Sequence, residues 1–314
     1  MDSTPTDPAG EETLQRLWAR GCDFLGTPTA ILGGAMSWVS ERNLVSAISN
    51  AGGFGIIACG SMDPDMLCTE IAATAALTDK PFGVNLITMH PDLDALIDVC
   101  LAKTVGHVVL AGGLPRTAQI ARIKAGGAKV LCFAPTLTFA HKLMRSGADA
   151  LIIEGMEAGG HIGPVSTSVL AQEILPEIDD VPVFVAGGIG HGEAVAAYLE
   201  MGASGCQLGT RFVCAEESIA HPDFKKRLLR AQARDAQVSS QLDPRFPVVP
   251  VRALANAASE RFLDVQRAVI AKVEAGEFDQ KAAQLEIEHF WIGALRRAII
   301  DGDVDNGSVM AGQS

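Results

Sequence analysis

The sequence predicts an α/β fold, a (β/α)8 TIM barrel with a helical insertion after its eighth strand. Three observations favour it: eight short apolar runs between residues 29 and 209, amphipathic segments between them, and a recurring glycine where a helix passes into a strand. Runs that are apolar throughout are typical of parallel strands buried on both faces. A doubly wound sheet is the structural alternative, but it usually has fewer strands and less even spacing.

The eight predicted strands are 29–34, 54–59, 82–87, 106–111, 128–133, 149–153, 181–186 and 205–209. Helical segments between them include 41–50, 64–77 and 191–201. Four junctions share one pattern: "SNAGGFGII", "IKAGGAKVL", "MRSGADALI" and "LEMGASGCQ". Glycine at this place supplies the left-handed residue that ends a helix and allows a tight turn into the next strand.

The chain is expected to have four parts. Residues 1–24 form a polar N-terminal tail, 25–213 carry the barrel, 214–290 form a helical insertion near the barrel mouth, and 291–314 contain the closing helix and a glycine-rich tail. The start, "MDSTPTDPAGEE", lacks the basic residues and apolar stretch of a signal peptide.

Composition narrows the function classes. The net charge of -12 argues against non-specific binding to nucleic acid, and no apolar run approaches the roughly 20 residues that cross a bilayer. The seven cysteines are odd in number and scattered, without a CxxC pair, which indicates reduced thiols. We therefore expect a cytoplasmic protein that acts on a small molecule, binds neither nucleic acid nor membrane, and is compatible with a homodimer.

Glycine-rich turns close the last two predicted strands. Gly187 and Gly188 follow the seventh strand, and Gly209 and Thr210 end the eighth. Binding groups of a TIM barrel gather at the C-terminal ends of its strands, where backbone N–H groups can cradle a phosphate. Neither loop contains a lysine, so this is not a Walker loop. The alternative is that these glycines only make packing turns.

Two further strand ends indicate a planar cofactor. Gly33 and Gly34 would let the backbone approach a flat ring, and Asn85 offers an amide in an otherwise apolar strand. Taken alone, Asn85 favours a structural hydrogen bond over a ligand contact. Beside a phosphate cradle, flavin mononucleotide (FMN) fits better than a dinucleotide, because a GxGxxG sequence at the first strand–helix turn is missing.

The candidate catalytic residue is His161, in "EGMEAGGHIGP" after the sixth predicted strand. Histidine exchanges protons near neutral pH, and neighbouring glycines such as Gly160 leave the ring accessible. The alternative is a loop histidine with a structural partner. Glu154 and Glu157 orient His161, cap the following segment or are simply solvated. The spacing of histidines predicts no metal site, and no GxSxG sequence for a serine nucleophile occurs.

These residues resemble the flavin-dependent nitronate monooxygenases (formerly 2-nitropropane dioxygenases), a family that includes the FMN-containing enoyl-acyl-carrier-protein reductases of type II. The matching stretches span most of the chain: "GGAMSWVS", "AGGFGII", "LTDKPFGVNL", "EGMEAGGHIG", "AGGI", "GTRFVCAEESIAHPDFK" and "GDVDNGSVMAGQ". The first-strand stretch "GTPTAILGGAMSW" departs from the proline-apolar-glutamine start that is usual in both branches.

The resemblance implies an FMN site at the strand ends and His161 as the catalytic histidine. The implied cofactor contacts are grouped by the part of FMN they meet: Gly33, Gly34, Ala35, Met36 and Asn85 at the ring, Gly160 in the turn that clears space beside it, and Gly187, Gly188, Gly209 and Thr210 at the phosphate.

Three reactions stay open at this stage. The first is oxidation of nitronates or nitroalkanes with O2 by a monooxygenase. The second is reduction of an enoyl thioester with NAD(P)H as electron donor, since both branches need a flavin and a proton-transfer group. The third, from another class, is an isomerase or aldolase that binds a phosphorylated sugar without flavin.

Overall fold

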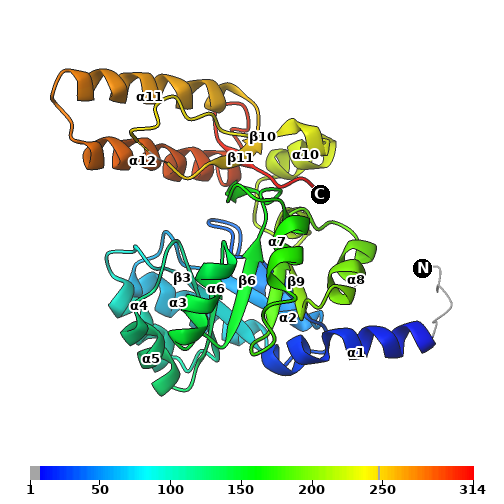
Figure 1. Ribbon diagram of the computed structural model, residues 1–314. Coiled ribbons are helices and arrows are strands. Elements are labelled where there is room, and N and C mark those ends of the chain that lie inside the picture. Colours follow the sequence, from blue (N-terminus) through cyan, green and yellow to red (C-terminus); the bar gives the residue numbers. More distant parts are fainter. Residues whose placement is uncertain (1–7, 247) are drawn as a thin grey trace.

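The computed structural model describes residues 8–246 and 248–314. It contains a closed parallel barrel and, above it, a second layer made of a small sheet and a helical hairpin (Figure 1). The barrel strands are β1 (Ile31–Gly33), β2 (Gly55–Ala58), β3 (Phe82–Ile87), β4 (His107–Ala111), β5 (Lys129–Phe133), β6 (Ala150–Glu154), β8 (Val183–Ala186) and β9 (Gly205–Leu208). Their order is β1-β9-β8-β6-β5-β4-β3-β2, and a parallel bridge between Leu32 and Phe54 joins β1 to β2. All eight predicted strands and the TIM barrel are confirmed.

Helices surround the barrel as the predicted alternation requires. They are α2 (Arg42–Asn50), α3 (Pro64–Leu77), α4 (Leu93–Ala102), α5 (Thr117–Ala125), α6 (Leu137–Arg145), α7 (Thr167–Ile174) and α8 (Gly192–Glu200). The short helix α9 (Thr210–Val213) follows β9, and α10 (Pro222–Arg230) lies beside the second layer (Figure 1). Each of the four repeated junctions contains a glycine with positive φ, at Gly52, Gly127, Gly147 and Gly202. Glycine adopts this conformation without a steric penalty, so the predicted helix ends are confirmed.

Helix α1 (Pro8–Leu25) replaces most of the expected N-terminal tail. Trp18 and Leu25 are buried in the barrel core, and a Cβ on Gly21 would collide with the Ser204 carbonyl at the start of β9. The prediction of a polar tail over 1–24 was therefore wrong from residue 8 onward. The start of this segment is acidic, but apolar residues follow at helical spacing and form a stripe on one face. They include Leu14, Leu17, Trp18 and Leu25.

The last turn of α1 closes the N-terminal end of the barrel around His107. Its Nε2 donates to the Phe24 carbonyl at 2.9 Å, and its ring packs edge-on against Phe24 and Phe54, with centroids 5.3 and 4.9 Å away. Burial lowers the pKa of His107 from 6.5 to about 4, although the bond to the Phe24 carbonyl opposes this change. The folded protein therefore holds this ring neutral.

The pKa of His107 predicts a loss of stability in acid. Its contribution to the free energy of unfolding is complete above pH 6.5 and is lost as the pH falls toward 4, because only the unfolded chain gains the proton easily. We expect the free energy of unfolding, measured in urea, to fall by about 3 kcal/mol more between pH 7 and pH 4 in the native protein than in His107→Gln. Parallel pH curves for the two proteins would contradict this assignment.

The upper layer is a four-stranded sheet and a hairpin of two long helices. The strands are β7 (Gly160–His161), β10 (Ala236–Val238), β11 (Val251–Leu254) and β12 (Val309–Met310), with β11 pairing antiparallel to the other three. The hairpin consists of α11 (Ala257–Glu274) and α12 (Gln280–Ile299), which lie side by side in Figure 1. A 3-10 turn, η1 (Ala233–Asp235), precedes β10.

This layer differs from the expected insertion and closing helix. Residues 214–290 include two strands, the predicted boundary at 290/291 falls inside α12, and the glycine-rich tail contributes β12. The strands of this sheet are two to four residues long and pair with distant partners. Such short strands carry no readable periodicity, so their sequence gave no local signal.

The hairpin has a hydrophobic core of its own. Phe262 lies 4.3 Å from Trp291 and 5.4 Å from Phe290 between ring centroids. The same cluster includes Val248 and Val251, which attaches the hairpin to the small sheet. None of the helices in the described part of the chain combines the length and hydropathy needed to span a membrane.

Candidate active site

The candidate site lies where the C-terminal ends of the barrel strands face the small sheet. The chain shows this directly, because β6 ends at Glu154 and continues through a short loop into β7, which pairs with β11. The barrel mouth is thus bordered by strand–helix loops below and by the small sheet and hairpin above (Figure 1). Ligand-binding groups of this fold belong at this end.

Gly33 and Gly34 have different surroundings. A Cβ on Gly33 would lie 2.5 Å from Cδ1 of Ile48, so this glycine lets α2 pack closely against β1. On Gly34 a Cβ would come no closer than 3.4 Å to the Leu208 carbonyl, which is ordinary contact. The Gly34 amide donates to that carbonyl at 2.8 Å and joins the loop to β9. Of the pair, Gly34 therefore has the more open position.

Ala35 and Met36 follow in the loop that leads to α2. Ser40 closes this loop: its hydroxyl donates to the Gly34 carbonyl at 2.8 Å and accepts from the Met36 amide at 3.0 Å. The Met36 sulfur lies 3.6 Å from the position of a Cβ on Gly209. The predicted ring-binding loop and the predicted phosphate-binding loop are therefore neighbours.

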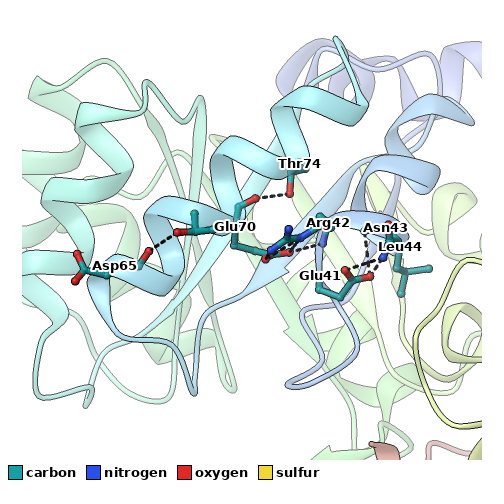
Figure 2. Close-up of polar contacts among 8 residues, drawn as sticks. Glu41, Arg42, Asn43, Leu44, Asp65, Glu70 and Thr74 are labelled. Carbon is teal, nitrogen blue, oxygen red and sulfur yellow. Dashed lines mark hydrogen bonds and ion pairs between the residues drawn. The ribbon is translucent and has the colours of Figure 1, made fainter.

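A half-buried ion pair anchors the start of α2. Glu70, on α3, accepts from the backbone amide and the guanidinium of Arg42, including an Nε–Oε2 bond of 3.1 Å. Figure 2 shows this carboxylate pointing at Arg42, while Glu41 caps the helix through the amides of Asn43 and Leu44. The Glu70 side chain is only 9% exposed. These contacts hold the end of the Gly34–Ser40 loop against α3 and restrict its movement.

Asn85 is buried in β3 and lacks a partner for one polar atom. Its Oδ1 makes no hydrogen bond with any other described residue, and its side chain is 5% exposed in total. A buried carbonyl without a donor costs roughly 1–3 kcal/mol. A bound molecule that presents an N–H or O–H group at this point would remove that cost, so Asn85 fits a ligand-binding role.

Glu154 ends β6 at the barrel mouth. Burial raises the pKa of its carboxyl to about 7, and no opposing interaction with a neighbouring group offsets this. A carboxyl group with a pKa near neutrality at a strand end is a recognised mark of functional sites. The sequence left Glu154 as a partner of His161, as a cap of the following segment or as solvated, and its partial burial argues against full solvation.

Glu157 caps the start of α7, and in the described residues its side-chain hydrogen-bond partner is Thr167 and not His161. Its Oε2 accepts from the Thr167 amide at 2.8 Å and from the Thr167 hydroxyl at 2.9 Å. That hydroxyl lies 3.0 Å from the Gly187 carbonyl. From the other side, Nε of Arg252 donates to the Met156 carbonyl at 2.8 Å. The loop after β6 is therefore fixed both to the barrel and to the small sheet.

The two glycine turns lie beside the C-terminal segment. A Cβ on Gly188 would approach the Gln313 carbonyl to 3.3 Å, and one on Gly190 would approach Cβ of Ser314 to 3.0 Å. The Thr210 hydroxyl accepts from the Gly312 amide at 2.9 Å. Gly187 and Gly188 have φ of 99° and 70°, so their turn needs glycine for its backbone as well. The segment 311–314 thus forms a third wall of the predicted cradle, which the sequence analysis missed.

Arg211 is a second residue that the sequence analysis missed. Its Nε donates to the Gly190 carbonyl at 2.8 Å, which joins the turn after β9 to the turn after β8. Neither loop contains a lysine, but the guanidinium of Arg211 lies between them and is well suited to bind a phosphate. The sequence offered one signal for this role: Arg211 directly follows Thr210, a predicted phosphate-binding residue.

His161 lies above these loops, in β7. It pairs with Val251 of β11, and its Nε2 lies 3.3 Å from Oε2 of Glu288 on α12. Gly160, with φ of 81°, pairs with Arg252 one position earlier. Contacts therefore join Met36, the glycine turns and Gly160 through the C-terminal segment, whereas no contact between His161 and Asn85 is recorded among the described residues.

Comparison with known proteins agrees with this arrangement. The family model described as nitronate monooxygenase matches residues 20–96 and 93–314. The structure of FabK from Thermotoga maritima superposes with a TM-score of 0.83, at 37% identity, over 94% of this chain and 88% of that one. A nitronate monooxygenase from Paraburkholderia phytofirmans is 29% identical over 299 residues, covering 80% of this chain and 78% of the relative.

Another relative is named as a carboxyl-CoA dehydrogenase and not as a nitronate monooxygenase. It is the (3aS,4S,5R,7aS)-5-hydroxy-7a-methyl-1-oxo-octahydro-1H-indene-4-carboxyl-CoA dehydrogenase of Rhodococcus jostii, 37% identical over 221 residues and 70% of this chain. The chain spans 62% of the length of that relative. The family match covers nearly all described residues, and the predicted resemblance is confirmed: the chain belongs to the nitronate monooxygenase family.

Proposed function

We propose that the protein is an FMN-dependent oxidoreductase of nitronate monooxygenase type that oxidises nitronates or nitroalkanes with O2. The family match over residues 20–314 carries this proposal. The nitronate monooxygenase of Paraburkholderia phytofirmans, which aligns over most of its own length, supports the same activity. A cytoplasmic location is part of the proposal.

The residues at the barrel mouth fit FMN. The unpartnered Oδ1 of Asn85 would accept a hydrogen bond from the ring system, beside the open backbone at Gly34. Gly188, Thr210 and the guanidinium of Arg211 would hold the phosphate. When bound, FMN supplies the redox chemistry, taking electrons from the substrate and passing them to O2.

His161 is the proposed proton-transfer residue. Its side chain is 48% exposed, so a small substrate can reach the ring. A neutral imidazole can take the proton from the carbon that bears a nitro group, and it can orient a nitronate whose proton has already gone. Glu157 and Arg252 support this role, because they fix the loop that leads to His161.

A specific observation favours a second candidate, an NAD(P)H-dependent enoyl-thioester reductase. The FabK structure and the carboxyl-CoA dehydrogenase are each 37% identical to this chain, a higher identity than that of the nitronate monooxygenase relative. In that reaction His161 would give a proton to the α-carbon of the thioester instead of taking one from a nitroalkane.

Anaerobic reduction of the purified yellow protein separates the two candidates. We expect ethyl nitronate to bleach the flavin absorbance in a stopped-flow mixer at least about 10-fold faster than NADH or NADPH does, and oxygen to restore it. Fast bleaching by NAD(P)H with none by nitronate would replace the first candidate with the second. A colourless protein that takes up no added FMN would instead indicate a barrel that binds a phosphorylated sugar.

A further inference from the structure

The ring of His161 has a carboxylate partner that comes from the helical hairpin. Nε2 of His161 and Oε2 of Glu288 are 3.3 Å apart, and their side chains are 48% and 28% exposed. Within the described residues, Glu288 is the one acidic side chain that forms an ion pair with this ring. A carboxylate oxygen only accepts hydrogen bonds, so the neutral ring donates through Nε2–H.

Glu288 is held in place by its own contacts. Its second oxygen, Oε1, accepts from the Val249 amide at 3.2 Å. The residues around it on α12, Ile287 and Trp291, are buried in the same hydrophobic cluster as Val251 of β11. Packing therefore fixes this part of α12 against the small sheet, and both carboxylate oxygens have defined positions.

The histidine is fixed to the same small sheet. His161 lies opposite Val251 in the β7–β11 ladder, and the Ile162 amide donates to the Pro250 carbonyl at 2.9 Å. The residue opposite His161, Val251, and the residue whose amide holds Glu288, Val249, thus lie two positions apart in the same segment. Such a shared support keeps the ring and the carboxylate in register.

We propose that Glu288 is the positioning residue of His161, a role that rests on the proposed function in which His161 moves the substrate proton. With Nε2–H donated to Glu288, Nδ1 is the basic atom of the neutral ring. When Nδ1 takes the proton from a nitroalkane carbon, the electron pair of the C–H bond stays with the substrate and the ring becomes positive. The Glu288 carboxylate keeps its charge and stabilises the imidazolium.

The kinetic test compares two substitutions on α12. Glu288→Gln removes the charge but leaves an amide oxygen that can still accept from Val249, so the local fold is kept. Glu286→Gln makes the same charge change on an exposed side chain of the same helix. We expect Glu288→Gln to lower kcat about 10- to 100-fold with KM within about 2-fold, and Glu286→Gln to change neither.

A double-mutant cycle tests whether Glu288 acts through His161. In a His161→Ala background, Glu288→Gln should cause no further loss of residual turnover, because the ring that it orients is gone. An equal loss in both backgrounds would overturn the proposal.

The tautomer of His161, measured spectroscopically without substrate, tests the role of Glu288 independently of the reaction that the protein catalyses. In ¹⁵N-labelled protein at a pH where the ring is neutral, Nε2 of His161 should carry the proton and Nδ1 should not. Glu288→Gln should shift both nitrogen signals toward a mixture of tautomers, and Glu286→Gln should not. Unchanged signals in Glu288→Gln would overturn the role of Glu288. Full turnover in His161→Ala would overturn the proton-transfer role of His161, whereas the tautomer measured in the native protein would stand.

Discussion

His161→Ala is expected to keep its FMN and to lose at least about 100-fold in kcat with a nitroalkane substrate. The ring lies in β7 above the barrel, and its recorded polar partner is Glu288 of the hairpin, not a residue of the glycine turns. Removing it therefore leaves the predicted cofactor contacts intact and removes only the group that moves the proton. Steady-state oxygen consumption measures turnover, and the flavin absorbance of the purified variant measures cofactor content.

A matched control for this experiment is His141→Ala. His141 lies on α6, in the outer ring of helices, and should leave kcat unchanged. Retained turnover in His161→Ala would exclude the assigned role. Loss of the yellow colour in that variant would place His161 among the cofactor-binding residues instead.

Gly209→Asp is expected to weaken FMN binding at least about 50-fold relative to Gly209→Asn, since a like charge placed against a bound phosphate costs several kcal/mol. Gly209 precedes α9 with φ of -110°, which L residues adopt, and a Cβ there meets only the Met36 sulfur at 3.6 Å. Aspartate and asparagine have nearly the same size and are both favoured before a helix. The two variants therefore differ mainly in charge.

Riboflavin, which lacks the phosphate, separates charge repulsion from a general disturbance of the site. Fluorescence titration should give Gly209→Asp and Gly209→Asn similar affinities for riboflavin, and only FMN should discriminate between them. If FMN binds equally to both variants, the phosphate lies elsewhere and the assignment of Gly209 and Thr210 to its cradle is wrong.

Burial of Glu154 was beyond the reach of sequence reasoning. The sequence places Glu154 at a strand end, but its pKa of about 7 comes from surrounding atoms supplied by other elements. The same holds for Glu157, which lies four residues before His161 yet binds Thr167. Proximity along the chain made both residues candidates to orient the histidine, and the structure gives that contact to Glu288, 127 residues away.

By itself, the sequence determined the barrel, its eight strands and the strand ends that hold the candidate site. Those features depend on local signals: apolar runs for buried parallel strands, and glycine at Gly52, Gly127, Gly147 and Gly202 for the turns between helix and strand. The position of His161 after the sixth predicted strand followed from the same pattern.

Only the tertiary structure decided how α1 closes the far end of the barrel, and how the small sheet and the C-terminal segment complete the site. Trp18 in the barrel core, the two-residue strand β7 and the Gly312–Thr210 hydrogen bond all join residues that are distant in sequence. Such contacts depend on which surfaces meet after the barrel closes, and short strands or single caps leave no periodic trace in the chain. The partner of His161 belongs to this group, because a helix and a strand must pack together before Glu288 can reach the ring.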